Sequence, residues 1–364
     1  MKSKRSVLGC FPVYGLFIAV AITSTSHADD FNAPEFPPLN HNTQDWPVSL
    51  SPNCSGIQIS PHIIITTRFC ITPDETGGGT YYPAAQMWTW PGTPVAAPES
   101  GLGLPANGDV GILVLNSNFE EFEYRLKPAK IPSYQQEKAA LEDETRSWLY
   151  GTIMRQQGPS VWATRWSSYL KAPNYNVPRG NGIFHVDAGE LWLTGNLSAT
   201  DQNTRLSLYW PWVYKEMTDR GLRTEAINFA KSVLGDHDWG SNEQRGSVGE
   251  IYIYDNPYNK DIEFFRLIWV DNNQRYGDFP TNKRNSNNWE YLGTSLPTAQ
   301  QATTAIHTWS WERRGKVGDI YVYNNPYSRQ IEYFKLLKNT YGYFPINQSS
   351  DANWQYLGQK LPTQ

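Results

Sequence analysis

"CSGIQISPHIIITTRFC", residues Cys54 to Cys70, is the stretch that decides how the first half of this chain is interpreted. It has a cysteine at each end, a Ser-Gly pair after the first cysteine, and Phe69 immediately before the last. Its centre, His62 to Thr67, is rich in isoleucine and threonine, which are enriched in β-strands. The stretch therefore predicts β-structure bounded by two cysteines.

The start of the chain has the layout of a secretory signal peptide. A basic stretch, residues 2–5, precedes an apolar run from Phe11 to Ile22, and Ser26-His27-Ala28 fits a small-x-small cleavage site. We expect cleavage after Ala28 and a secreted chain, either extracellular or periplasmic. The alternative is a membrane anchor, for which an apolar run of about a dozen residues is short.

Removal of this segment leaves two of the three cysteines, Cys54 and Cys70. Two cysteines in an exported chain most simply form one disulfide, which would close a loop of about 15 residues and contribute about 3 kcal/mol. Two free buried thiols are the alternative. No histidine or further cysteine stands at ligand spacing from them, so we predict no metal site and no cofactor.

Composition narrows the classes of partner. The net charge of −4 argues against nucleic acid, which needs a basic face. No later segment approaches 18 apolar residues, so no membrane span is expected after the signal. The chain is 14% aromatic and 18% charged, which favours a β-rich protein that binds a surface.

The last third of the chain contains a repeat. "RGSVGEIYIYDNPYNKDIEFFRL" from Arg245 matches "RGKVGDIYVYNNPYSRQIEYFKL" from Arg314, with equivalent residues 69 positions apart. Farther on, "WEYLG" and "WQYLG" are 65 positions apart. Alternation at period two on both sides of an Asn-Pro-Tyr turn predicts a β-hairpin in each copy, followed by a short last strand.

Repeats of this kind duplicate a binding surface as well as a fold. We expect some aromatic residues to fill small cores and others to form a stacking platform for sugar rings or a protein surface. The candidate binding residues are Trp289, Tyr291, Trp354, Tyr356, Tyr276 and Tyr341. Carboxylates also recur in both copies, which we interpret as solvent-facing residues rather than as a glycosidase pair. These are Glu250, Glu263, Asp319 and Glu332.

The region from about residue 40 to residue 221 alternates short β-like runs with turn signals, which predicts a barrel or sandwich. It closes on "LYWPWVYKEMTDRGL", whose apolar residues recur at helical spacing before Gly221. The predicted organisation is a signal peptide at 1–28, a first domain at 29–222, a linker at 223–239, and two modules at 240–299 and 300–364.

The first domain resembles the trypsin/chymotrypsin family of serine proteases. "WPVSL", residues 46–50, and the stretch from Cys54 to Cys70 resemble the family's W-P-x-x-V-S-L, C-S-G-x-x-I-S-P and T-A-A-H-C segments. "NGDVGILVL", which contains Asp109, resembles the strand with the triad aspartate, and "VDAGELWLTG" resembles the nucleophile segment G-D-S-G-G-P. The resemblance covers about half of the chain. It implies an all-β fold, a trypsin-like double β-barrel with a C-terminal helix, followed by the two small tandem β-modules.

The same resemblance implies that catalysis is lost. Phe69 stands at the imidazole position and Ala188 at the nucleophile position, so only Asp109 of the triad remains. A phenyl ring cannot transfer a proton, and alanine has no hydroxyl. Val186 replaces the family's glycine before Asp187, and no activation-type N-terminus precedes "QDWPVSL". We therefore expect no catalytic residues.

The leading interpretation is a secreted pseudo-protease that acts as a binding protein. Its tandem modules would bind a glycan or a cell or matrix surface, and a protein partner could occupy the vestigial cleft. Two alternatives remain open: an active secreted serine endopeptidase with a misread or non-standard triad, and a structural or toxin-complex assembly subunit.

Overall fold

The computed structural model describes the chain in segments, and the expected signal peptide lies outside them. The described residues are 47–51, 54–71, 92–98, 109–116, 128–142, 148–150, 169–171, 180, 182–187, 190–196, 202–235, 246–270, 285–286, 288–308, 316–338, 344–345 and 348–361. They form a mainly β structure with several antiparallel sheets and few helices, and no closed barrel is found among them.

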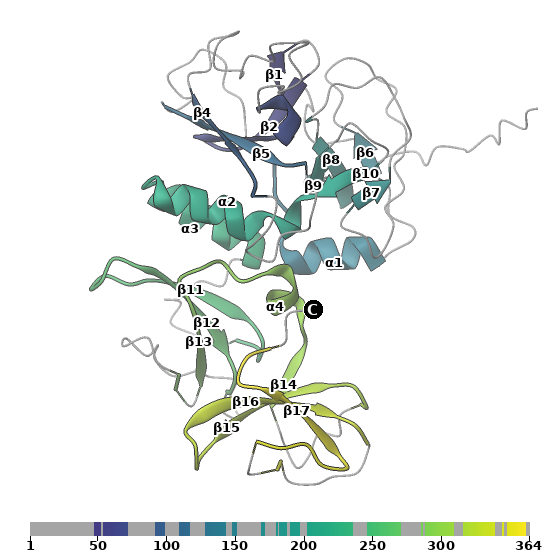
Figure 1. Ribbon diagram of the computed structural model, residues 1–364, viewed down its shortest axis with the longest axis vertical. Helices are drawn as coiled ribbons and strands as arrows, with labels where there is room; N and C mark the ends of the chain where they lie inside the picture. The colour runs from purple at the N-terminus through teal and green to yellow at the C-terminus, as the bar shows by residue number, and fades with distance from the viewer. Residues whose placement is uncertain are drawn as a thin grey trace, which may run out of the picture. The chain divides into compact units, whose positions relative to one another are not determined.

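The first sheet contains the opening stretch and has five antiparallel strands in the order β1-β2-β3-β5-β4 (Figure 1). Its strands are β1 (Pro47–Ser51), β2 (Cys54–Ser60), β3 (Ile63–Thr66), β4 (Gly92–Ala96) and β5 (Gly111–Leu115). Strands β2, β3 and β5 are buried along their whole length, and β2 is buried although it contains Ser55, Gln58 and Ser60.

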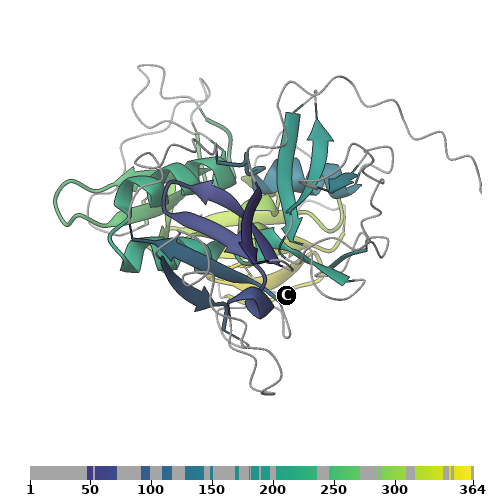
Figure 2. The ribbon, with the colours of Figure 1, turned by 90° about the horizontal axis from the view of Figure 1, so that it is seen from above.

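The second sheet also has five antiparallel strands, in the order β6-β8-β9-β10-β7. Its strands are β6 (Trp148–Tyr150), β7 (Tyr169–Lys171), β8 (Gly182–Asp187), β9 (Glu190–Asn196) and β10 (Gln202–Arg205). In Figure 2 its strands are teal, and those of the first sheet are purple to blue.

Two features bring the sheets together. The segment before helix α1 (Tyr134–Glu142) bridges them, because Ala129 N–H donates to the Gln58 carbonyl of β2 and Leu193 N–H of β9 donates to the Lys130 carbonyl. Gly180 lies so close to the first sheet that an added Cβ would be 1.9 Å from the Ser55 carbonyl oxygen. Its φ of 85° also favours glycine.

Two helices follow the second sheet. The predicted helix is confirmed as α2 (Trp210–Asp219), and Gly221 after it has a φ of 76°. The segment expected as a linker at 223–239 contains helix α3 (Arg223–Leu234). Its apolar side chains are buried in the core that the first domain shares with the first module, so this segment is structural rather than a spacer.

Each repeat forms a small sheet, and the predicted hairpins are present. The first module contains β11 (Ile251–Asp255), β12 (Ile262–Leu267) and β13 (Trp289–Gly293), and helix α4 (Ala299–Thr303) follows it. The second contains β14 (Ile306–Thr308), β15 (Ile320–Asn325), β16 (Gln330–Leu336) and β17 (Trp354–Gly358), with β14 parallel to β15.

The two modules agree in fine backbone detail. The register shifts between Phe264 and Phe265 in β12, and between the equivalent Tyr333 and Phe334 in β16. Glycines in the positive-φ region, Gly293 and Gly358, end the last strand of each copy. The repeat seen in the sequence is therefore a repeat of backbone conformation.

A buried polar network joins the two modules. The Arg266 guanidinium of β12 donates to the Glu290 carboxylate of β13 at 3.0 Å and to the Tyr333 hydroxyl of β16 at 3.1 Å. It also donates to the Gln301 carbonyl of α4 at 2.7 Å, and Tyr333 donates to Glu290. In the second module the residues equivalent to Arg266 and Glu290 are Lys335 and Gln355, and both are exposed. The network therefore belongs to the junction and not to the repeated unit.

Candidate functional site

The predicted disulfide is confirmed. Cys54 at the start of β2 is bonded to Cys70, with the two Cα atoms 5.7 Å apart. Both cysteines are buried with Leu50, Ile64 and Leu113. The bond fixes the short 3-10 turn Arg68–Cys70 against the start of strand β2.

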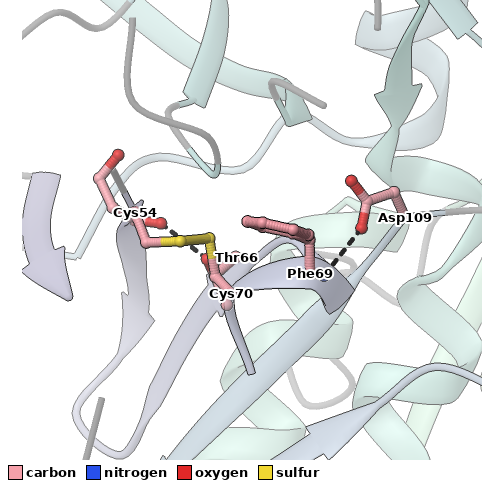
Figure 3. The surroundings of a disulfide bond; sticks show 6 residues. Cys54, Thr66, Phe69, Cys70 and Asp109 are labelled. Atoms are coloured by element: carbon pink, nitrogen blue, oxygen red, sulfur yellow. Dashed lines mark hydrogen bonds between the residues drawn. A yellow bond between two sulfur atoms is a disulfide. The ribbon is translucent and has the colours of Figure 1, made fainter. Parts of the chain in front are cut away.

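Phe69 and Asp109 lie together, as the resemblance requires of the imidazole and carboxylate positions. Phe69 follows β3 and Asp109 precedes β5, and the pairing of Thr66 with Gly111 brings these two strand ends side by side. The Phe69 backbone N–H donates to Asp109 Oδ1 at 3.1 Å. Figure 3 shows the phenyl ring directed toward the disulfide and away from the carboxylate, and the ring packs against the apolar cluster around that disulfide.

The backbone hydrogen bond to Asp109 holds the turn in place, but the side chain of residue 69 has no group that could transfer a proton. The Asp109 carboxylate holds the backbone of the turn, which is a structural task. Ala188, the nucleophile position, lies outside the described residues. The backbone on either side of it is described, and Asp187 pairs with Glu190 where β8 turns into β9.

His185 is the histidine nearest to the nucleophile position in the sequence, and it is a core residue. It is fully buried on β8, and its Nδ1 lies 2.8 Å from the Thr194 hydroxyl of β9. An imidazole held between two strands in this way is positioned by the sheet, which favours a structural role for it.

Two of the predicted binding residues are core side chains. Trp289 is 0% exposed and packs edge-on against Tyr252, and Trp354 is 2% exposed and packs edge-on against Tyr321. Both indoles are enclosed in the structure, so neither presents a ring face at the surface of its module. Each ring fills the small aromatic core of its own module, and the two cores are built from equivalent residues.

Tyr291 and Tyr356 are half-buried and occupy equivalent places beside a buried phenylalanine. The Tyr291 ring centre is 5.2 Å from that of Phe265, and the Tyr356 ring centre is 5.3 Å from that of Phe334. These tyrosines extend the aromatic core to the module surface. Tyr276 and Tyr341 lie outside the described residues.

The recurring carboxylates do not all face solvent. Glu263 and Glu332 are fully buried, which corrects the expectation, whereas Glu250 and Asp319 are partly exposed. Asn256 Nδ2 donates to Glu263 Oε1 at 3.3 Å, and Asn325 Nδ2 donates to Glu332 Oε1 at 3.0 Å. A buried carboxylate needs such donors because desolvation is otherwise costly. Each glutamate thus anchors the turn of its hairpin.

Sequence reasoning missed the aromatic residues that are most exposed within the described part of the modules. Tyr258 is 82% exposed and Tyr327 is 76% exposed, at the same place in the two hairpin turns. The signal was present in the sequence, because Asn-Pro-Tyr recurs in both copies at a turn, where a side chain projects from the sheet. The tryptophans were chosen as candidate binding residues because their rings are large, but a large apolar ring also favours burial in a core.

Other site types find no support among the residues the structure describes. Within those ranges no group of three or more histidine, cysteine or acidic residues could hold a metal ion, and no helix is both long and apolar enough to cross a membrane. No known protein-family model matches the chain.

Proposed function

We propose that this chain is a catalytically inactive homologue of trypsin/chymotrypsin-like serine proteases, secreted and acting as a binding protein. Its tandem modules would bind a glycan or another macromolecular surface. One observation carries the proposal: Phe69 occupies the position beside Asp109 where the reaction needs an imidazole, and its ring is packed against the disulfide.

The scaffold supports the relationship. Two five-stranded antiparallel sheets, a bridging segment between them and a helix after the second sheet support this relationship, and neither sheet closes into a barrel among the described residues. The Cys54–Cys70 disulfide agrees with an oxidising compartment, since such bonds persist in exported proteins.

The chemistry of acyl transfer explains why this scaffold would not turn over peptides. A serine hydroxyl must lose its proton to an imidazole, and the carboxylate only orients that imidazole. Loss of either the serine or the histidine in such a site lowers kcat by about 10⁶-fold. With phenylalanine and alanine at the two positions, only binding roles remain for the cleft.

The substitution Phe69→His tests this proposal. We expect the variant to hydrolyse a panel of fluorogenic peptides no faster than the wild type, because Ala188 still lacks a nucleophilic oxygen. Phe69→Tyr is the matched control, since it changes the ring without adding an imidazole. Turnover in the histidine variant that is absent from the tyrosine variant would overturn the assignment of the two positions.

A further inference from the structure

Among the described residues of the modules, exposed aromatic side chains are duplicated at one place only. Tyr258 and Tyr327 are both exposed and are 69 positions apart. The other exposed large apolar residues have no exposed aromatic counterpart. Trp269 corresponds to Lys338, Val317 to the half-buried Val248, and Leu337 to the buried Ile268. Two copies that differ at many surface positions both keep a tyrosine ring in solvent at the hairpin turn.

Each ring is presented by a backbone that is held in place. The Tyr258 N–H donates to Asn256 Oδ1 at 3.0 Å, and the Tyr327 N–H donates to Asn325 Oδ1 at 2.9 Å. These are Asx turns. Both asparagines are buried, and their amide groups are fixed in turn by the buried glutamates described above. A ring on a pre-ordered turn loses little conformational entropy on binding.

A basic residue accompanies each ring. Lys260 and Arg329, two positions after the tyrosines, are exposed and have φ values of 64° and 57°, in the left-handed region. Their backbone N–H groups donate to the Asn256 and Asn325 carbonyls at 3.0 and 2.8 Å. We call each such pair, Tyr258 with Lys260 and Tyr327 with Arg329, a tyrosine tip.

The differences between the tips restrict the ligand. Asp255 and Asp261 flank the first tip, and uncharged Asn324 and Gln330 stand at the equivalent positions of the second. A partner recognised through complementary charge would meet two different charge patterns. What the tips share is a flat ring with a hydroxyl beside one exposed basic side chain that can donate hydrogen bonds. This chemistry suits a neutral sugar, whose C–H face packs on the ring and whose hydroxyls accept hydrogen bonds.

The duplication restricts the ligand further. A site present twice in one chain gains avidity only when the ligand offers the same group twice within reach. A polysaccharide does so at every repeat of its unit. The buried hydrogen bonds among Arg266, Glu290 and Tyr333 connect the two modules, so both tips belong to one joined pair of modules.

We propose that the two tyrosine tips are contact points for one neutral polysaccharide chain. This inference rests on the proposed function, in which the modules are the binding part of the protein. It moves the binding role from the buried tryptophans to Tyr258 and Tyr327, and it narrows the ligand from any surface to an uncharged polymer of sugars.

Co-sedimentation of the full chain with insoluble chitin, cellulose and starch tests the inference. The wild type should sediment with at least one of them. Tyr258→Ala and Tyr327→Ala should each weaken that binding about 100-fold, because the loss of one tip already removes avidity, and the double variant should sediment no more than a control without polymer. Trp269→Ala is the matched control: it removes an exposed aromatic ring that has no aromatic counterpart, and binding should stay at the wild-type level. An unchanged urea midpoint shows that each variant is folded.

Parallel arms with a sulfated polysaccharide and with phosphatidylcholine vesicles distinguish other ligand classes. Three outcomes would each contradict the assignment of the tyrosine tips as polysaccharide contacts. They are binding only to the sulfated polysaccharide or only to the vesicles, no sedimentation with any neutral polymer, and undiminished binding by the double variant. Polysaccharide binding that survives the double variant would leave the modules as binding units. Peptide turnover in the Phe69→His variant would instead contradict the proposed function without affecting the tips.

Discussion

Arg266→Leu should lower the free energy of unfolding by about 3–5 kcal/mol at pH 7, because it leaves the Glu290 carboxylate buried without its counter-ion. Arg266 is 1% exposed, and its guanidinium also donates to Tyr333 and to the Gln301 carbonyl. Such a loss is a large fraction of the total stability of a typical domain. Urea unfolding followed by tryptophan fluorescence measures it.

The loss should also depend on pH. Burial raises the pKa of Glu290, and the Arg266 charge opposes that rise. Without the arginine, the folded-state pKa of Glu290 rises further above its unfolded value. A carboxyl group with a raised folded pKa contributes stability that is present below the unfolded pKa and is lost as pH rises through the folded pKa. The variant should therefore be less destabilised near pH 4 than at pH 7.

Lys335→Leu is the control, because Lys335 occupies the equivalent position in the second module and is exposed. It should change stability by no more than about 0.5 kcal/mol. The double variant Arg266→Leu/Glu290→Leu should recover part of the loss, since removal of both charges leaves no buried ion. A single Arg266→Leu variant within about 1 kcal/mol of the wild type at pH 7 would show that the junction is not as described.

Trp289→Ala should cost about 3–5 kcal/mol, the range for removing a fully buried large aromatic ring. The ring packs against Tyr252, with centroids 5.1 Å apart, and lies in a cluster with Phe265 and Leu267. This module has a small core, so little else could fill the space. The same urea titration measures the change.

Trp269→Ala provides the comparison, because Trp269 is 48% exposed and its loss should change stability by about 0.5 kcal/mol or less. A Trp289→Ala variant with wild-type stability but lost ligand binding would favour the sequence-based interpretation, in which this ring contacts the ligand. A destabilised variant agrees with the core position seen in the structure.

Local sequence signals predicted much of the modules. Alternation at period two located β11, β12, β15 and β16, and Asn-Pro-Tyr located the turns between them. The same period places Glu263 and Phe265 on one face of β12, but it cannot say whether that face is covered. In the second module Phe344, from the connection between β16 and β17, packs on Phe334 and Trp354. Burial thus depends on residues that the pattern of a single strand does not include.

Helix α3 is a different kind of error, because its signal was in the sequence. Ala226, Phe229, Ala230 and Val233 follow the i, i+3, i+4, i+7 spacing of an amphipathic helix and are all buried. The Arg266 network had no such signal. Arg266 and Lys335 are equivalent in the repeat, and only the junction between modules makes one buried and the other exposed.

The disulfide could be predicted from the sequence, because two cysteines in an exported chain most simply pair. The resemblance gave positions for Phe69 and Asp109 but not the backbone hydrogen bond between them. What a pattern could not supply was the direction of the Phe69 ring, which packing around Cys54 and Cys70 decides.

The central claim is that this scaffold no longer carries a reactive serine. Incubation of the folded wild-type chain with a serine-directed phosphonate, followed by intact mass measurement, tests it most directly. The account predicts an unchanged mass under conditions in which active trypsin is fully labelled. A stoichiometric adduct that maps to one serine would contradict it.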